Sequence, residues 1–197
     1  GRHGFTRVGQ PIEIWRISKL RPADLLKVDS EDLWNWWHFH LESGIKAVLD
    51  GAAHASAPVK GSILLFDLKG FGARHLNRQC LSVLGSLFGV GQSKYPESTS
   101  KIFIVNAPSL FSGAWAIIKT VLEDRTRNKI IITNKGYHEA LSALVPDDVM
   151  PQFLGGKCVC TIGEKMTLSG ASFTEVHIKA RGDFKVAVEV QEGGYVG

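Results

Sequence analysis

The clearest hydrophobic pattern in the chain lies between residues 109 and 123. On a helical wheel of 3.6 residues per turn, its apolar side chains fill one arc roughly 160° wide, well above the ~100° that suffices to face a core. They are Leu110, Phe111, Ala114, Trp115, Ile117, Ile118, Val121 and Leu122. The pattern predicts a helix with more apolar surface than one packing contact needs. Two interpretations stay open: a well-buried core helix, or a helix that lines a cavity for an apolar ligand.

Further apolar runs predict β-strands, and helical patterns lie between them. The predicted strands cover residues 12–17, 62–68, 101–106 and 130–132. The runs at 62–68 and 130–132 are nearly continuous, as expected for strands covered on both faces. The other predicted helices cover residues 23–27, 30–49, 76–88 and 136–145. This alternation indicates an α/β fold in which a largely parallel β-sheet forms a floor and helices pack on it.

The predicted helix at residues 30–49 carries more aromatic residues than its core-facing side can hold. Ser30 is a suitable N-cap. The main apolar face consists of Leu33, Trp34, Trp37, Leu41, Ile45, Val48 and Leu49. Trp36 and Phe39 fall on the other side. They are ordinary surface aromatics, or they form a contact surface for a partner protein or a membrane.

Near the C-terminus the pattern changes to strict alternation of apolar and polar residues. It covers residues 176–179 and 184–191, with Arg181-Gly182-Asp183 between the two runs. This predicts a β-hairpin within a second segment, residues 172–197. Because a lone hairpin is marginal in water, it would dock on the main domain or begin a further one.

Composition narrows the classes of function. The chain has 197 residues, of which 44% are hydrophobic and 21% charged, and a net charge of +4. So small a charge does not call for nucleic acid, but it suits contact with an anionic lipid surface. No run reaches the ~18 apolar residues of a membrane span, and the start has no secretory pattern. Three cysteines, an odd number, favour thiols over a disulfide framework. We therefore expect a cytoplasmic protein, peripheral to membranes, and a first residue that is Gly rather than Met indicates a fragment.

Three polar residues near the central elements are candidates for ligand binding. Lys129 is a cation at the start of an apolar strand and a fitting partner for a phosphodiester. Thr126 can donate to the same phosphate or to a sugar-like ring, and Glu97 can accept from ring hydroxyls or pair with Lys129. A structural interpretation also stays open, in which they are a first-turn helix acid, a turn residue and a solvated strand end.

Other motifs argue against catalysis and against metal binding. Cys158-x-Cys160 has no second cysteine pair, and His38 and His40 point apart on a helix, so zinc lacks a ligand set. The glycine-rich segment at 89–93 follows a helix and precedes a turn, whereas a phosphate loop follows a strand. No Gly-x-Ser-x-Gly elbow occurs. We expect no catalytic residue, no metal and no cofactor.

Five short segments occur in the order and spacing found in CRAL-TRIO domains. They are Asp67-Leu68-Lys69-Gly70, Tyr95-Pro96-Glu97, Ile104-Val105-Asn106-Ala107-Pro108, Thr126-Arg127-Asn128-Lys129-Ile130 and Gly155-Gly156-Lys157. Over residues 8–160 the chain thus resembles the lipid-binding domains of the secretory-pathway phosphatidylinositol-transfer proteins. The C-terminal hairpin is similar to the opening strands of a GOLD domain, which follows CRAL-TRIO domains in some proteins.

The resemblance implies a phospholipid ligand, phosphatidylinositol first, with its headgroup at Glu97, Thr126 and Lys129. The acyl chains would fill an apolar pocket gated by the helix at 109–123. The pocket and gate residues expected on this basis are Ser62, Leu64, Phe66, Phe103, Val105, Leu110, Phe111, Ala114, Trp115, Ile118, Val121 and Leu122. The family's sequence signature for phosphatidylcholine binding is only partly present in this chain, because Leu64 stands where a Thr is expected and Glu13 where a Tyr is expected.

Two classes of function follow. In the first, the protein binds a phospholipid and transfers or presents it during transient contact with a membrane. In the second, the same fold is a scaffold for a small GTPase or a kinase. That partner would be held through helices that precede the domain in the family, or through Trp36 and Phe39. A hydrolase, for which no constellation of residues is found, is a third hypothesis.

Overall fold

The computed structural model describes residues 1–159, so the hairpin expected within 172–197 lies outside the described residues. Five strands form one sheet in the order β1-β2-β3-β4-β5. They are β1 (Arg2–Phe5), β2 (Pro11–Arg16), β3 (Ser62–Asp67), β4 (Thr99–Val105) and β5 (Ile130–Ile132). β1 runs antiparallel to β2, and every other neighbouring pair is parallel. The predicted α/β class with a largely parallel sheet is confirmed.

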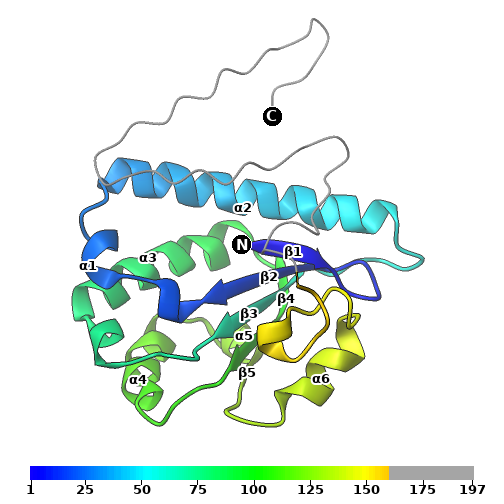
Figure 1. Ribbon diagram of the computed structural model, residues 1–197. Helices are drawn as coiled ribbons and strands as arrows, with labels where there is room; N and C mark the ends of the chain where they lie inside the picture. Colours follow the sequence, from blue (N-terminus) through cyan, green and yellow to red (C-terminus); the bar gives the residue numbers. More distant parts are fainter. Residues whose placement is uncertain (160–197) are drawn as a thin grey trace, which may run out of the picture.

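Helical crossovers join each parallel strand to the next. β2 and β3 are joined by η1 (Ile17–Lys19), α1 (Pro22–Leu25) and α2 (Ser30–Ala53). β3 and β4 are joined by η2 (Ala73–Leu76) and α3 (Arg78–Lys94), and β4 and β5 by α4 (Phe111–Val121) and α5 (Asp124–Arg127). α6 (Tyr137–Leu144) and η3 (Gln152–Leu154) follow β5. Since the strand order never reverses and such crossovers are right-handed, α3 and α4 lie on one side of the sheet and α6 on the other (Figure 1).

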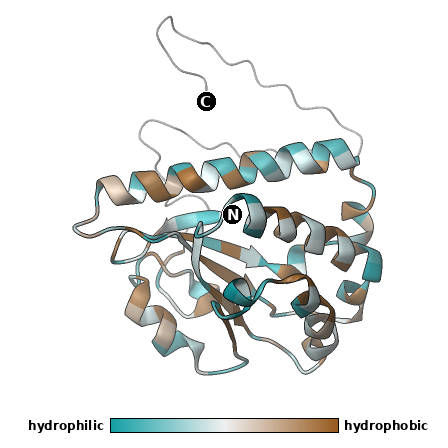
Figure 2. Cartoon of the chain, turned by 180° about the vertical axis from the view of Figure 1, so that it is seen from behind, coloured by the Kyte–Doolittle hydropathy of each residue, from teal (hydrophilic) through white to brown (hydrophobic). Residues whose placement is uncertain are grey.

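The two faces of the sheet carry different sets of side chains. Along β3, Ile63 and Leu65 are buried against Leu141 of α6 and Leu154 of η3. Leu64 points to the opposite face, as the period of two in a strand requires, and is only half-buried. Seen from behind, the strands are mostly hydrophobic, whereas α2 carries hydrophobic and hydrophilic residues along its length (Figure 2).

Two helix boundaries differ from the prediction. Asp29, not Ser30, caps α2, because its carboxylate accepts a hydrogen bond of 2.8 Å from the backbone N–H of Glu31. α3 continues to Lys94, so the glycine-rich segment 89–93 lies inside a helix and not before a turn. A Cβ on Gly91 would make an ordinary van der Waals contact, 3.6 Å from the side chain of Leu41 on α2.

The edges of the sheet were predicted least well. β1 was not predicted at all, because its sequence Arg-His-Gly-Phe shows no apolar alternation. β5 was predicted to be covered on both faces, which is wrong, since Ile131 and Ile132 are 43% and 40% exposed. β5 has only three residues, and within the described part of the chain it pairs with β4 alone, so its apolar side chains face partly into solvent.

Cysteine chemistry also departs from the expectation. Cys80 is a buried free thiol, whereas Cys158 is disulfide-bonded, so the expectation of thiols alone is wrong for Cys158. Within residues 1–159, none of the helices has the length and apolar character to cross a bilayer. The same part of the chain contains no group of three or more His, Cys, Asp or Glu residues that could hold a metal ion.

The contact between α2 and the β1–β2 turn offers a test of the fold. A Cβ at Gly51 would lie 2.0 Å from the carbonyl oxygen of Gly9 and 3.1 Å from the ring of Phe5. We expect Gly51→Ala to lower the free energy of unfolding by about 1–3 kcal/mol, the usual cost of overpacking, in a denaturant titration. Gly113→Ala is the matched helical control, because nothing lies within 4 Å of its added Cβ. It should stabilise by ~1 kcal/mol. If Gly51→Ala has the same free energy of unfolding as the parent, the close contact between α2 and the β1–β2 turn is not formed as described.

Candidate functional site

A long cavity lies between the sheet and helices α2, α3 and α4. Its floor is the face of the sheet that α6 does not cover, and it includes Leu64, Phe66, Ile102 and Ile104. Across from them, α3 contributes Leu81, Leu84 and Phe88. Apolar side chains therefore make up most of the wall, which suits hydrocarbon rather than a charged metabolite.

α4 turns its apolar arc toward this cavity. The wall includes six residues on or next to the helix, namely Phe111, Ala114, Trp115, Ile118, Val121 and Leu122. All six were predicted pocket residues. Leu110 was predicted with them, but it does not line the cavity and is 43% exposed. Of the two interpretations of the 109–123 pattern, the one in which the helix lines a cavity describes the structure.

The strand residues of the predicted pocket divide between the two faces of the sheet. Ser62, Leu64 and Phe66 line the cavity, as predicted. Phe103 and Val105 do not, because they lie in the core on the α6 side, where they are 1% and 0% exposed. The prediction chose the wrong face of β4, whose cavity-lining residues are Ile102 and Ile104. A continuous apolar run gives no indication of which alternate set faces which side.

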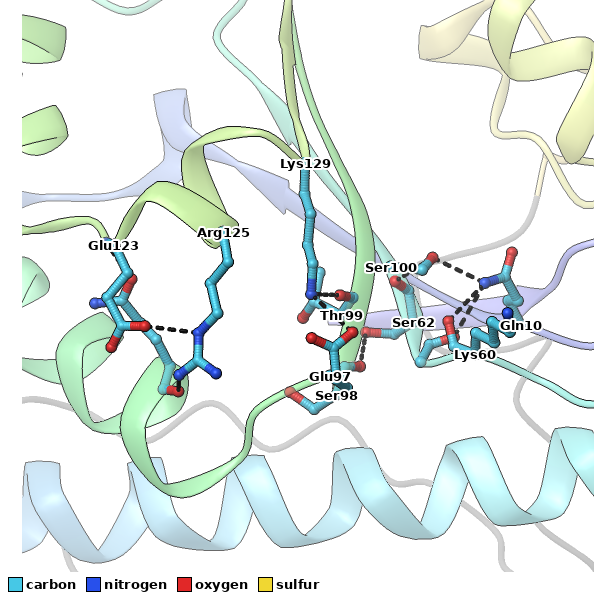
Figure 3. Close-up of polar contacts among 12 residues, drawn as sticks. Gln10, Lys60, Ser62, Glu97, Ser98, Thr99, Ser100, Glu123, Arg125 and Lys129 are labelled. Atoms are coloured by element: carbon cyan, nitrogen blue, oxygen red, sulfur yellow. Dashed lines mark hydrogen bonds and ion pairs between the residues drawn. The ribbon is translucent and has the colours of Figure 1, made fainter.

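The predicted headgroup residues meet at the ends of β4 and β5, beside one end of the cavity wall. Lys129 Nζ lies 3.3 Å from Glu97 Oε2 and donates to the carbonyl oxygen of Thr99 at 2.9 Å (Figure 3). Thr126 lines the cavity from α5, and no hydrogen bond of its hydroxyl is found among the residues described. We call Glu97, Thr126 and Lys129 the mouth of the cavity.

The backbone of Glu97 adopts a left-handed conformation, with φ of 63°. This region favours glycine and disfavours a side chain with a Cβ. The Glu97 side chain is 77% exposed, and its ion pair with Lys129 is therefore weak in water. The strain places a carboxylate at the mouth without an evident gain in stability, as is common at binding sites.

A group of hydrogen bonds fixes the C-terminal end of α4 to α3, and the sequence did not indicate it. The Gln92 side chain donates to the Val121 carbonyl at 3.0 Å and accepts from the Glu123 N–H at 2.9 Å. Arg125 pairs with the Glu123 carboxylate at 2.6 Å (Figure 3) and donates to the Gln92 carbonyl at 2.9 Å. We call Gln92, Glu123 and Arg125 the latch. The pattern could not reveal the contacts between α3 and the end of α4, because their partners are 29 to 33 residues apart in the chain.

A second polar group lies on the β2 side of the cavity. Glu13 is 6% exposed, and its Oε1 accepts hydrogen bonds from the indole N–H of Trp15 and, at 2.8 Å, from Nε2 of His40. Burial by itself would raise the pKa of this carboxyl. The hydrogen bond from His40 and the charges of His40 and Arg2 outweigh burial and hold the pKa below its ordinary value. Glu13 is thus a buried acid on a largely apolar wall, and a lone acid between Ile12 and Ile14 was the available indication in the sequence.

Comparison with known proteins bears on this arrangement. A family model described as the CRAL/TRIO domain matches residues 1–156. The phosphatidylinositol/phosphatidylcholine transfer protein SFH7 of Arabidopsis thaliana is 29% identical over 162 residues, and the protein real-time of Drosophila melanogaster is 29% identical over 168 residues. The matches cover 81% and 83% of this chain but 30% and 26% of those proteins. The chain therefore spans less than a third of the length of these relatives.

A solved structure has a similar fold. The crystal structure of Sfh5 matches with a TM-score of 0.52, covering 73% of this chain and 49% of that chain. The sequence identity is 16%, so the likeness is one of fold alone.

The strain at Glu97 can be measured with two substitutions. We expect Glu97→Gly to have a higher free energy of unfolding than Glu97→Ala by about 1 kcal/mol, because a Cβ in the left-handed region costs about 1–2 kcal/mol and glycine offsets part of this through its own entropy. Both variants lose the ion pair with Lys129, so a denaturant titration of the two isolates the backbone. Equal stabilities would mean that the loop relaxes without cost.

Proposed function

The chain is a member of the CRAL/TRIO domain family, and from this premise we propose that it binds a phospholipid and transfers it between membranes. The observation that carries the proposal is an apolar cavity with a cation and a hydroxyl at its mouth. An acyl chain that leaves a bilayer exposes CH₂ groups to water at ~0.8 kcal/mol each. A cavity that receives the chains removes this cost, and no covalent step is needed. The activity is carriage and not catalysis.

Phosphatidylinositol is the ligand that suits the mouth. Lys129 has three N–H donors, and the contacts to Thr99 and Glu97 occupy two of them. The third can donate to the phosphate of the lipid. The Thr126 hydroxyl can donate to the same group, and the exposed Glu97 carboxylate can accept from inositol hydroxyls. The mouth thus offers donors for the phosphate and an acceptor for the ring.

Entry of the lipid would require α4 to move. α4 forms one wall of the cavity, and its last turn is held by the latch. Gly113 loosens its first turn, since glycine in a helix costs ~1 kcal/mol relative to alanine. The outer side of α4 carries Ile117, 41% exposed, beside the exposed Lys119, and Val121 on the cavity wall is still 46% exposed. This mixture suits contact with an anionic membrane surface, so we propose that exchange occurs there and that the carrier otherwise resides in the cytoplasm.

A protein scaffold is the second candidate function. The observation in its favour is on α2, where Trp36 is 44% and Phe39 71% exposed. Exposed aromatic residues are frequent at protein interfaces. Extraction of the purified protein with organic solvent, followed by mass spectrometry, separates the two functions. A stoichiometric phospholipid supports carriage. Its absence, with no uptake from phosphatidylinositol vesicles, supports the scaffold.

Lys129 is the residue with which to test the mouth. We expect Lys129→Ala to weaken phosphatidylinositol binding about ten- to hundredfold, because a hydrogen bond to a charged group contributes about 1.5–3 kcal/mol. Binding is measured with phosphatidylinositol vesicles, and thermal unfolding shows that the fold is intact. Lys101→Ala removes an exposed lysine of β4 that does not line the cavity, and it should bind as the parent does. Full binding by Lys129→Ala would refute the headgroup assignment.

The latch should control the rate of exchange. Gln92→Ala removes two hydrogen bonds to the end of α4, each worth about 0.5–1.5 kcal/mol net. We expect lipid transfer between labelled and unlabelled vesicles to accelerate by about two- to tenfold or more, with little change in equilibrium affinity. Gly113→Ala should slow transfer, because it stiffens α4. Ser93→Ala is the matched control, since this hydroxyl bonds only to Val90 within α3. Unchanged transfer by both α4-directed variants would mean that α4 does not gate the cavity.

A further inference from the structure

The carboxyl edge of the sheet carries an excess of positive charge. β2, β3, β4 and β5 run parallel, so the segments that start at or just after their last residues all leave from one edge of the sheet (Figure 1). These segments, residues 16–21, 68–78, 106–113 and 133–136, contain no Asp or Glu. They contain seven exposed bases, namely Arg16, Lys19, Arg21, Lys69, Arg74, Arg78 and Lys135. We call this surface the basic edge.

Neighbouring acids do not neutralise the basic edge. The one acid at the last positions of these strands is Asp67, which is 2% exposed and accepts hydrogen bonds from the Lys69 N–H at 3.0 Å and from Asn106 Nδ2 at 2.8 Å. Within residues 1–159, Arg21 is the only base of the edge with an ion pair, at 3.8 Å from Asp24. Seven of the 23 Lys and Arg residues but one of the 19 Asp and Glu residues lie at this edge, so the rest of the chain has more acids than bases.

Contacts between the first two segments hold several of these bases on one surface. Arg74 donates to the carbonyl oxygen of Ser18 at 3.0 Å, and a Cβ on Gly70 would lie 3.1 Å from that of Ser18. Lys19 and Lys69 are the sequence neighbours of these residues, so they lie on the same part of the edge. Like charges gathered on one surface repel one another, and an anionic partner relieves this repulsion. The basic edge therefore stabilises a complex with an anion and not the isolated fold.

An exposed leucine lies beside these bases. α4 begins at Phe111, whose ring centroid lies 5.6 Å from that of Phe71 in the segment 68–78. Leu110, the residue before α4, is 43% exposed and does not line the cavity. A basic surface with an exposed leucine suits an anionic bilayer, which attracts the bases and receives the apolar side chain at its interface. Single-stranded nucleic acid stacks on aromatic rings instead, and the four segments of the basic edge expose none.

We propose that the basic edge is the surface by which the protein docks on a bilayer, and that its partner is a bilayer rich in anionic lipid such as phosphatidylserine. The bases attract the lipid headgroups, and Leu110 enters the interface between them. The inference rests on the proposed function, since a carrier must visit membranes, but it does not depend on which lipid fills the cavity. α4 begins at the basic edge and ends at the latch, so the docking surface and the mouth lie at opposite ends of this helix.

Neutralised lysines test the electrostatic part of the proposal. The changes Lys19→Gln, Lys69→Gln and Lys135→Gln are combined in one variant, because no hydrogen bond or ion pair of these side chains is found within residues 1–159. The full chain is sedimented with phosphatidylcholine vesicles that contain or lack phosphatidylserine. We expect the variant to bind the phosphatidylserine vesicles about a hundredfold more weakly than the parent, or about fivefold for each lysine. Binding of the parent should also weaken as the salt concentration rises.

The matched control removes the same charge from other surfaces. It combines Lys46→Gln, Lys94→Gln and Lys101→Gln, three exposed lysines of α2, α3 and β4. Because they lie away from the basic edge, we expect this variant to bind within a fewfold of the parent, as roughly a Debye length of salt solution screens distant charges. Equal binding by the two triple variants overturns the proposal, and so does a parent chain that binds equally with and without phosphatidylserine.

A leucine variant tests the apolar part. Leu110→Ala should weaken binding to the phosphatidylserine vesicles by about tenfold, because it removes CH₂ and CH₃ groups from the interface, and it should leave the salt dependence as in the parent. Leu49→Ala, an exposed leucine of α2, is the control and should bind as the parent does. Binding of Leu110→Ala equal to that of the parent contradicts insertion at this position.

Two further measurements separate the remaining explanations. Binding of the parent to a single-stranded RNA oligonucleotide, without binding to phosphatidylserine vesicles, would assign the edge to nucleic acid and overturn the proposal. Uptake of phosphatidylinositol is followed separately by native mass spectrometry. A chain that docks on phosphatidylserine vesicles but takes up no phosphatidylinositol supports the basic edge and refutes the proposed carriage. A chain that takes up phosphatidylinositol without a preference for phosphatidylserine vesicles refutes the basic edge alone.

Discussion

The structure depends on one constraint, which is that a strand must send alternate side chains to opposite faces of its sheet. In β3 this separates Ile63 and Leu65 from Leu64 and Phe66. The first pair is enclosed by α6 and the segment after it. The second pair faces the crossover helices, and Leu81 of α3 and Phe111 of α4 pack against this face of the sheet. α3 approaches α4 closely at Gly85, where a Cβ would lie 3.2 Å from Val121. The helices therefore cover this face of the sheet and leave a cavity between themselves and the strands.

An apolar hollow of this kind is stable only if its polar edges are satisfied. At the mouth, Lys129 joins β5 to β4 through the Thr99 carbonyl and holds Glu97. A few residues earlier, Arg125 closes the latch on Gln92 and Glu123. Both sets of contacts lie within the short segment that follows α4. Lys129 and Arg125 therefore both belong to the segment that holds the end of α4.

The opposite edge of the cavity follows a different principle. There, the antiparallel β1 brings Arg2 next to Glu13. α2 contributes His40, which contacts Glu13, and Trp37, whose ring stacks on that of His40. Arg2 donates to Ser43 and to the His40 carbonyl, Glu13 accepts from Trp15 and His40, and the charge of Arg2 helps to hold the pKa of Glu13 below its ordinary value. The two edges thus differ in charge arrangement, although one continuous apolar wall joins them.

The sequence alone determined the α/β class and the positions of most helices, and it predicted that Glu97, Thr126 and Lys129 bind a lipid headgroup. These follow from local periodicity and from short motifs, because a helix or a strand imposes its period on the residues that form it. It also predicted that the helix at 109–123 would carry surplus apolar surface, which the cavity accounts for.

Only the tertiary structure decided which face of β4 lines the cavity, that β5 lies at an exposed edge, and that β1 completes the sheet. Phe103 and Ile104 are equally apolar, so only the placement of α4 and α6 distinguishes their environments. The latch and the Arg2–Glu13 pair also could not be predicted from the sequence. The latch joins residues 29 to 33 positions apart, which meet because α3 and α4 fold back over the same face of the sheet. Arg2 and Glu13 meet across the β1–β2 pair, and the sequence of β1 shows no apolar alternation from which that pairing could be predicted.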